Sequence, residues 1–257
     1  MKIFIATPMY GGMAKSVYVA GISDLTRELA AKGHTITHTS ITNESLVTRA
    51  RNTLANEFMK TDFDALLFID ADHGFVASDI VTMIESGKDL IGAPYPMKAI
   101  DWNNVRKAAL AGKQDLELYS GLFAINFLDE EQTFKSNEPF KVKDIGTGMM
   151  FIRRTVFEQL KSVCDNYRFN TIGDVVPFGQ EIVEYFKTMI TPEPEKVLLS
   201  EDYAFCHMWR EIGGEVWAAP WVRITHAGEY NFSGRLLATL EIGQVNAIDK
   251  EAEKKKK

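Results

Sequence analysis

Two aspartates at the end of an apolar run are the residues in this chain most suited to chemistry. The run Ala65-Leu66-Leu67-Phe68-Ile69 stops at Asp70-Ala71-Asp72. Residues two apart on an extended chain point to the same side, so Asp70 and Asp72 can converge on one hard cation and, through it, on a diphosphate. This arrangement suggests nucleotide-sugar chemistry. Because acidic turns after strands are common, the triplet needs support from other residues.

Three further segments could take part in such a reaction. Arginines within 48–52, at the start of an expected helix, can reach a diphosphate while backbone N–H groups add positive potential. Ser200-Glu201-Asp202 opens another helix, and a carboxylate there can take the proton of an attacking hydroxyl. Gly146-Thr147-Gly148 interrupts a strand, where glycine permits close approach of a ligand. Each segment also has a structural explanation. The arginines within 48–52 could be exposed on a helix surface, residues 200–202 could simply start a helix, and residues 146–148 could form a β-bulge.

His73 follows the aspartate triplet directly. On an extended chain its side chain would point away from the face that Asp70 and Asp72 share, so it is not expected to take part in the site.

The elements that must position these residues alternate between strands and helices. Pro8 and the glycines after it should end the first strand, and Ser78 should cap the third helix. This alternation implies a parallel sheet with helices on both faces. Strands are expected at residues 2–6, 35–39, 65–69 and 89–93, and helices at about 17–32, 46–59 and 78–86.

After Pro94 the regular alternation breaks, and the second half is expected to be mixed α/β. Residues 94–140 begin with a polar segment that contains Trp102, a candidate for the acceptor site because an aromatic there has little core to join. We find no internal repeat and no linker that would divide the chain. The remaining expectations are β structure at 118–127, 141–153 and 215–219, and helices at 155–161, at about 201–212 and from about Gly234.

Composition limits the classes of protein to which the chain can belong. With 46% hydrophobic and 25% charged residues it has the profile of a globular protein, and its longest apolar runs fall far short of the roughly 20 residues of a membrane span. Cys164 and Cys206 form no metal-binding or disulfide pattern, and a net charge of −6 argues against a broad nucleic-acid footprint. A cytoplasmic location is expected because the N-terminus reads as a strand and not as a signal peptide.

In combination and order, these motifs resemble the GT-A glycosyltransferases, over roughly residues 1–230. The resemblance implies an α/β fold with a GT-A domain at 1–235, followed by a helix and charged tail at 236–257. Within the domain, 1–100 would bind the nucleotide sugar and 101–235 the acceptor. The implied activity is transfer of a hexosyl group from a donor such as a UDP-sugar to a hydroxyl, assisted by Mn²⁺ or Mg²⁺.

The resemblance also gives individual residues a role. Asp70, Asp72 and the late His226 would hold the cation, and an imidazole beside carboxylates favours Mn²⁺. Asp202 would be the general base of an inverting reaction, with Glu201 beside it, although a retaining mechanism stays open. The donor-binding residues that it implies are Thr7, Pro8, Arg49, Arg51, Asn52, Asp70 and Gly148.

The acceptor stays open among a glycan, a lipid-linked sugar and a hydroxymethylated pyrimidine in DNA. The lysine tail with Lys98, Arg106, Lys107 and Lys113 could line a groove for DNA, but the overall acidity opposes this. A sugar-phosphate nucleotidyltransferase is less favoured, because residues 7–13 lack an arginine. A non-catalytic sugar-binding protein is a third class, which would keep its function after Asp72→Ala. The oligomeric state is not indicated.

Overall fold

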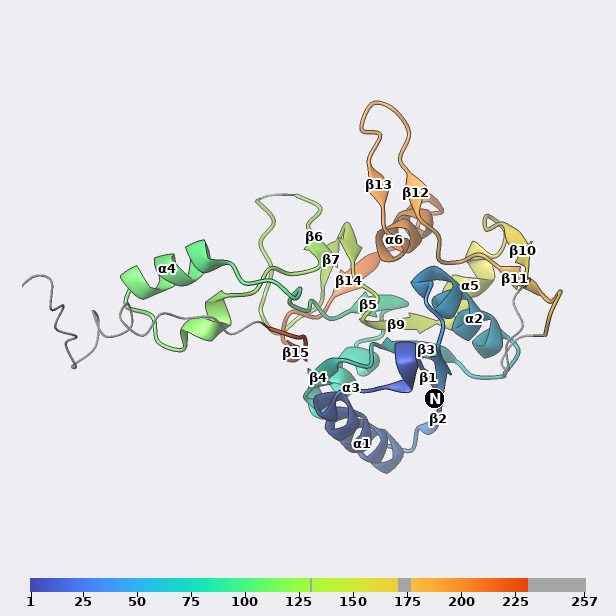
Figure 1. Ribbon diagram of the computed structural model, residues 1–257, viewed down its shortest axis with the longest axis horizontal. Helices are drawn as coiled ribbons and strands as arrows, with labels where there is room; N and C mark the ends of the chain where they lie inside the picture. The colour runs from blue at the N-terminus through green and yellow to red at the C-terminus, as the bar shows by residue number, and fades with distance from the viewer. Residues whose placement is uncertain (130, 171–176, 231–257) are drawn as a thin grey trace, which may run out of the picture. The chain divides into compact units, whose positions relative to one another are not determined.

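The computed structural model describes residues 1–129, 131–170 and 177–230 of the chain (Figure 1). Contacts gather Met1–Ala227 into one compact unit, which holds every site described below. The expected helix near Gly234 and the charged tail at 236–257 lie outside the described residues. Within the described ranges, no helix combines the length and the apolar character that crossing a membrane requires.

A seven-stranded sheet forms the centre of the unit, in the order β2-β1-β3-β9-β5-β14-β7 (Figure 1). β1 is parallel to β2 and β3, β9 is antiparallel to β3 and β5, and β14 is parallel to β5 but antiparallel to β7. β1, β2, β3, β5 and β14 therefore share one direction. The strands are β1 (Lys2–Met9), β2 (Thr35–Thr42), β3 (Ala65–Ile69), β5 (Leu90–Gly92), β7 (Phe140–Val142), β9 (Met149–Arg153) and β14 (Val216–Ala218).

Helices cover both faces of this sheet, as the alternating pattern predicts. Phe4 and Phe68 face a core that includes Phe58 of α2 and Phe157 of α5. Their strand neighbours point to a second core, which is built with α1 and α3. The helices are α1 (Ser16–Ala31), α2 (Val47–Met59), α3 (Ala77–Glu85), α4 (Trp102–Leu110), α5 (Arg154–Leu160) and α6 (Glu201–Glu211), with short 3₁₀ turns η1 (Tyr10–Gly12) and η2 (Leu116–Tyr119).

Short strand pairs extend the unit beyond the central sheet. The pair β4–β15 matters most here, because its antiparallel register sets His73 opposite His226 although more than half of the chain separates them. The pairs are β4 (His73–Phe75) with β15 (Ile224–His226), β6 (Ile125–Asn126) with β8 (Asp144–Ile145), β10 (Asn166–Arg168) with β11 (Glu181–Val183), and β12 (Met189–Ile190) with β13 (Leu198–Leu199).

Four local expectations were wrong. β1 continues through Pro8, because from Thr7 onward its described ladder is with β2, and the missing N–H needs no second partner there. Ser78 does not cap α3, which begins one residue earlier, after Val76. The run 118–127 is mostly not strand. The polar segment before it contains α4, which begins where the Asp101 side chain accepts a bond from the Asn104 N–H at 3.0 Å.

Candidate active site

A cavity of about 460 Å³ lies at the carboxyl ends of β1 and β3. Open α/β sheets bind ligands at this edge. Its lining includes Pro8 near the end of β1, Lys15 before α1, Asp70 and Asp72 after β3, and Arg51 from the first turns of α2. Of the expected donor-binding residues, the structure thus brings Pro8, Arg51 and Asp70 to one cavity.

The aspartate triplet is a turn and not an extended segment. β3 ends at Ile69, the Asp70 N–H donates to the Gly148 carbonyl at 2.9 Å, and the His73 N–H donates back to the Asp70 carbonyl at 3.1 Å. Because the chain turns between them, the two carboxylates reach different partners. Asp70 turns to Arg51 and Asp72 to His226. The expectation that an extended chain would aim both at one cation is therefore corrected.

Asp70 belongs to an ionic cluster with Arg51 and Glu201, in which Arg51 is buried, and two members of the cluster, Arg51 and Asp70, line the cavity. The Arg51 guanidinium, only 4% exposed, places Nη2 at 3.2 Å from both Asp70 oxygens and Nε at 3.4 Å from Glu201 Oε1. Burial lowers the pKa of Arg51, but the charges of Asp70 and Glu201 outweigh it, so the pKa lies above its usual value. Burial also raises the pKa of Glu201, against the opposing charge of Arg51. Arg51 Nη1 is buried without a hydrogen-bond partner among the described residues, which leaves a donor for a ligand.

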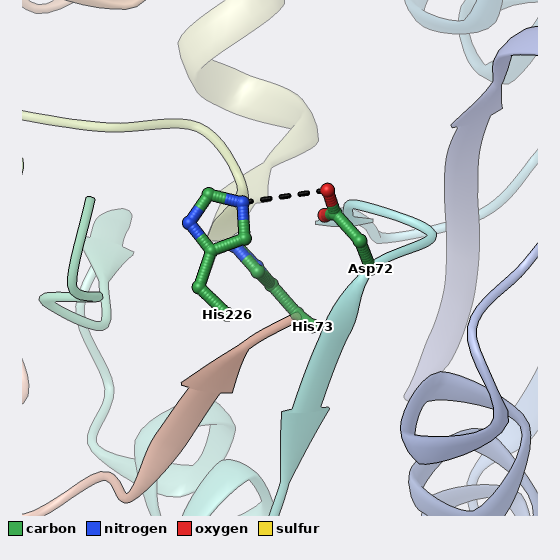
Figure 2. Close-up of side chains that lie close together, drawn as sticks. All are labelled: Asp72, His73 and His226. Atoms are coloured by element: carbon green, nitrogen blue, oxygen red, sulfur yellow. Dashed lines mark ion pairs between the residues drawn. The ribbon is translucent and has the colours of Figure 1, made fainter. Parts of the chain in front are cut away.

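Asp72 lies beside two histidines on the neighbouring ends of β4 and β15 (Figure 2). His226 Nε2 is 3.4 Å and Lys98 Nζ 2.5 Å from Asp72 Oδ2. The rings of His73 and His226 meet edge to face, with centroids 4.6 Å apart. One possible ligand atom from each of Asp72, His73 and His226 lies within 4.8 Å of the others, and Asp70 is not part of this group among the described residues.

The expectation that His73 points away from the site was wrong. The turn ends the alternation of the strand at Asp70, and pairing with β15 then directs the His73 ring toward His226. The only sequence signal for His73 was its position next to the triplet. Lys98, which was considered for a DNA groove, is instead the ion-pair partner of Asp72.

The Asp72 carboxylate lies beside two basic side chains, His226 and Lys98. Burial raises the pKa of Asp72, but hydrogen bonds and charges from His226 and Lys98 outweigh it, so the pKa lies well below its usual range. The hydrogen bond to Asp72 raises the pKa of His226. His226 Nδ1 donates to the Pro96 carbonyl at 2.8 Å, so Nε2 can face a carboxylate as part of an imidazolium or turn its lone pair to a cation.

The donor set of this group fits a divalent transition metal. Two imidazoles and a carboxylate are ligands that suit ions such as Mn²⁺. Nε2 of His73 is buried and lacks a partner in the part of the chain that the structure describes, so the site contains an unsatisfied polar atom of the ligand type.

Asp202 and Glu201 begin α6, on which Glu201 is held by Arg51. Asp202 Oδ1 accepts bonds from the Ser200 hydroxyl and, at 2.9 Å, from the Tyr203 N–H. Glu201 is thus joined to Asp70 through Arg51, and Asp202 follows it in the first turn of α6.

Four expected binding residues are engaged elsewhere. Thr7 is buried, and its hydroxyl is 2.7 Å from the Tyr18 hydroxyl. The Asn52 side chain makes two hydrogen bonds with the Phe186 backbone. Its Nδ2 donates to the carbonyl oxygen at 2.8 Å, and its Oδ1 accepts from the N–H at 2.7 Å. Arg49 pairs with Glu44. These three side chains are therefore positioned for structure and do not line the cavity.

Gly148, the fourth, makes room for side chains of the protein itself. A Cβ at this position would lie 2.4 Å from His73 Cε1 and 3.0 Å from Asp70 Oδ2. Gly148 therefore does permit a close approach, as expected, but the groups that approach it are the side chains of His73 and Asp70. Trp102, the acceptor-site candidate, is 62% exposed at the start of α4 and is not a lining residue of the cavity.

Comparison with known proteins gives a likeness of fold. No protein-family model matches the sequence, and no curated protein matches it. Similar solved structures include GalNAc-T7 with UDP, GalNAc and Mn²⁺, at 12% identity and a TM-score of 0.41 over 88% of this chain. Two others, each at 12% identity, are a glycosyltransferase involved in glycosylation of the major capsid of PBCV-1 (TM-score 0.32, 63% of this chain) and S. aureus TarS (TM-score 0.36, 85%).

The chain spans less than two thirds of each of these structures, covering 43%, 65% and 35% of their lengths. At such identities the likeness concerns the fold and not the substrates. The fold itself is the one that the motifs led us to expect, a mostly parallel sheet with helices on both faces and an acidic site at the strand ends. The chain has a mixed α/β fold around a mostly parallel sheet, and the solved structures that it resembles include glycosyltransferases.

Proposed function

We propose that the protein is a metal-dependent glycosyltransferase that moves a sugar from a nucleoside-diphosphate donor, such as a UDP-sugar, to a hydroxyl acceptor. The observation that carries the proposal is the composition of one cavity, which Arg51, Asp70 and Asp72 border while His226 contacts Asp72. Its volume of about 460 Å³ is within the range of small-molecule sites, about 300–1,000 Å³.

The donor would bind through groups at the inner wall of this cavity. Arg51 Nη1, buried and without a described partner, would donate to a phosphate oxygen, and Lys15 at the rim would add positive charge. Asp72 and His226 would hold the divalent cation. When bound, such a cation neutralises charge on a leaving diphosphate. The donor phosphates therefore would meet positive groups on both sides.

The acceptor hydroxyl would give its proton to Asp202. Glu201 is less suited to this role because its carboxylate is engaged with the Arg51 guanidinium. We assign Glu201 a positioning role, since it ties the start of α6 to Arg51 and through it to Asp70. Attack by an acceptor activated in this way would invert the configuration at the anomeric carbon.

The test is calorimetric titration of UDP, and in parallel GDP, with Mn²⁺ or with chelator. We expect one nucleotide to bind the wild type with Mn²⁺, and Asp72→Ala to abolish this binding. Asp62→Asn is the matched control, because Asp62 is an exposed aspartate that pairs with Lys2. Turnover of the matching nucleotide sugar would then be followed with glycan, lipid-linked and hydroxymethylated-DNA acceptors. Failure of folded protein to bind either nucleotide would contradict the proposal.

A further inference from the structure

We infer that His73 is a ligand of the cation, so that His73, Asp72 and His226 form the protein's metal site while Asp70 remains outside it. This inference rests on the proposed function, because it concerns the same cation. It differs from the expectation drawn from the sequence, in which Asp70 was the third ligand and His73 took no part.

The hydrogen bonds of the two rings fix which nitrogen is available to a metal. A carbonyl oxygen can only accept, so the bonds at 2.8 Å from His73 Nδ1 to Gly148 and from His226 Nδ1 to Pro96 require a proton on each Nδ1. In a neutral ring each Nε2 then carries a lone pair. Metal-binding histidines usually donate their second nitrogen to a carbonyl or carboxylate in this manner.

The packing of its neighbours fixes the orientation of the His73 ring. The residue is fully buried, its ring packs against both His226 and Tyr95 with centroid distances of 4.6 and 4.5 Å, and Gly148 lies against its Cε1 edge. A buried acceptor nitrogen without a partner costs free energy unless a ligand satisfies it. Its neighbours Asp72 and His226 offer ligand atoms within 4.8 Å, so a cation is the ligand that all three could share.

Asp70 is engaged in a different interaction. Both of its oxygens are 3.2 Å from Arg51 Nη2, and the arginine is also held by Glu201. Recruiting Asp70 to the cation would leave a buried guanidinium with one carboxylate fewer. Lys98, by contrast, is a half-exposed lysine on a flexible stem and can leave Asp72 when a cation arrives.

The experiment counts the histidine nitrogens on Mn²⁺ by pulsed electron paramagnetic resonance, using the full chain with Mn²⁺ alone and with Mn²⁺ and UDP. We expect couplings from two imidazoles in the wild type and from one in both His73→Phe and His226→Phe. Phenylalanine keeps a ring packed against Tyr95 and the remaining histidine. His34→Phe, which replaces an imidazole near Glu85, should keep both couplings.

Titration of Mn²⁺ without nucleotide gives a second readout. His73→Phe should weaken binding by more than about 100-fold, beyond the 10- to 100-fold loss typical of outer-shell partners, while Asp70→Asn, which removes only a nearby charge, should weaken it far less. Circular dichroism shows whether each variant is folded. The wild-type count needs no variant, so it decides the question even if His73→Phe does not fold.

A single imidazole coupling in the wild type, lost in His226→Phe, would overturn the inference, and so would a folded wild type that binds no Mn²⁺. In the first case the proposed function would stand, provided that nucleotide binding still requires Mn²⁺. In the second, turnover of nucleotide sugars in the presence of chelator would decide whether the protein is a glycosyltransferase without a metal.

Discussion

At the scale of single residues, Asp202 and Glu201 are neighbours with different environments. Glu201 faces the Arg51 guanidinium, whereas the hydrogen bonds to Asp202 from Ser200 and from the Tyr203 N–H are both made by Oδ1. The environments separate the two carboxylates into a positioning group and a candidate base.

Asp202→Asn should lower kcat by about 10²- to 10⁴-fold, the usual contribution of a general base, with little change in donor affinity. Steady-state kinetics with a nucleotide sugar and calorimetry of the nucleotide measure the two effects. Glu211→Gln, an exposed acidic position at the end of the same helix, is the control. If kcat falls equally in Asp202→Asn and Glu211→Gln, or if Asp202→Asn keeps its full kcat, Asp202 is not the general base.

Lys98 provides a second test at this scale, because its ammonium lies 2.5 Å from Asp72 Oδ2, where a cation would bind. Lys98→Met should tighten Mn²⁺ binding by about two- to fivefold, since a half-exposed ion pair contributes about 0.2–1 kcal/mol. The titration is repeated with Lys107→Met, a lysine in the last turn of α4. If Lys98→Met binds Mn²⁺ more weakly, the lysine supports the site instead of competing with it.

At the scale of elements, β15 carries His226, and a surface ion pair anchors it. Arg223, just before β15, contacts Asp79 in the first turn of α3, with Nε 2.8 Å and Nη2 3.0 Å from the two carboxylate oxygens. The hydrogen bond from Arg223 outweighs burial and lowers the pKa of Asp79. The ion pair therefore links the segment that carries His226 to α3.

Asp79→Asn should speed amide hydrogen exchange in Ile224–His226 and weaken Mn²⁺ binding, without unfolding the sheet. Because the folded pKa of Asp79 is depressed, the stabilisation is present above the unfolded value near 3.9 and is lost as the pH falls through the folded value. The wild type should thus approach the variant's exchange rate below about pH 4. Asp24→Asn, which breaks an ion pair within α1, is the control. Identical exchange in Asp79→Asn and wild type would show that β15 needs no such anchor.

The elements also show what a sequence can and cannot indicate. The first βαβ units were predictable because β3 is a continuous apolar run and α2 repeats its apolar residues at helical spacing. β4 and β15 have three residues each and are defined by pairing across more than half of the chain, which no local pattern encodes. α4 was missed although Trp102, Val105 and Ala108 recur at helical spacing, because the helix is short, is mostly exposed, and begins at the Asp101 cap.

The same distinction holds for the site. Asp72 and His226 were expected to share a cation because of the resemblance to GT-A glycosyltransferases, and the pairing of β4 with β15 does bring them together. Asn52 and Thr7 were expected to bind the donor, and in the structure their side chains contact other parts of the protein. Asn52 satisfies both backbone groups of Phe186, a residue 134 positions away. Only the tertiary fold reveals which of the two uses a side chain has.

At the scale of the whole molecule, two cores sandwich one sheet, and the site lies where the strands end. The first core joins α2, α5 and α6 and the second joins α1 and α3, so sequence-distant helices hold the same sheet from opposite faces. β9 runs against β3 and β5 and brings Gly148 to the turn after β3. This reversed strand places a segment from the later half of the chain between two strands from the earlier half.

The cavity and the metal group are completed at different points along the chain, and this has a consequence for biosynthesis. The lining residues of the cavity all come from positions 8–72, whereas the metal group waits for His226. A chain that ended before Ile224 would thus contain the residues that line the cavity but would lack His226, which the proposed cation site needs. If the proposed cation site is correct, retention on a cation-affinity resin would report whether translation has passed β15.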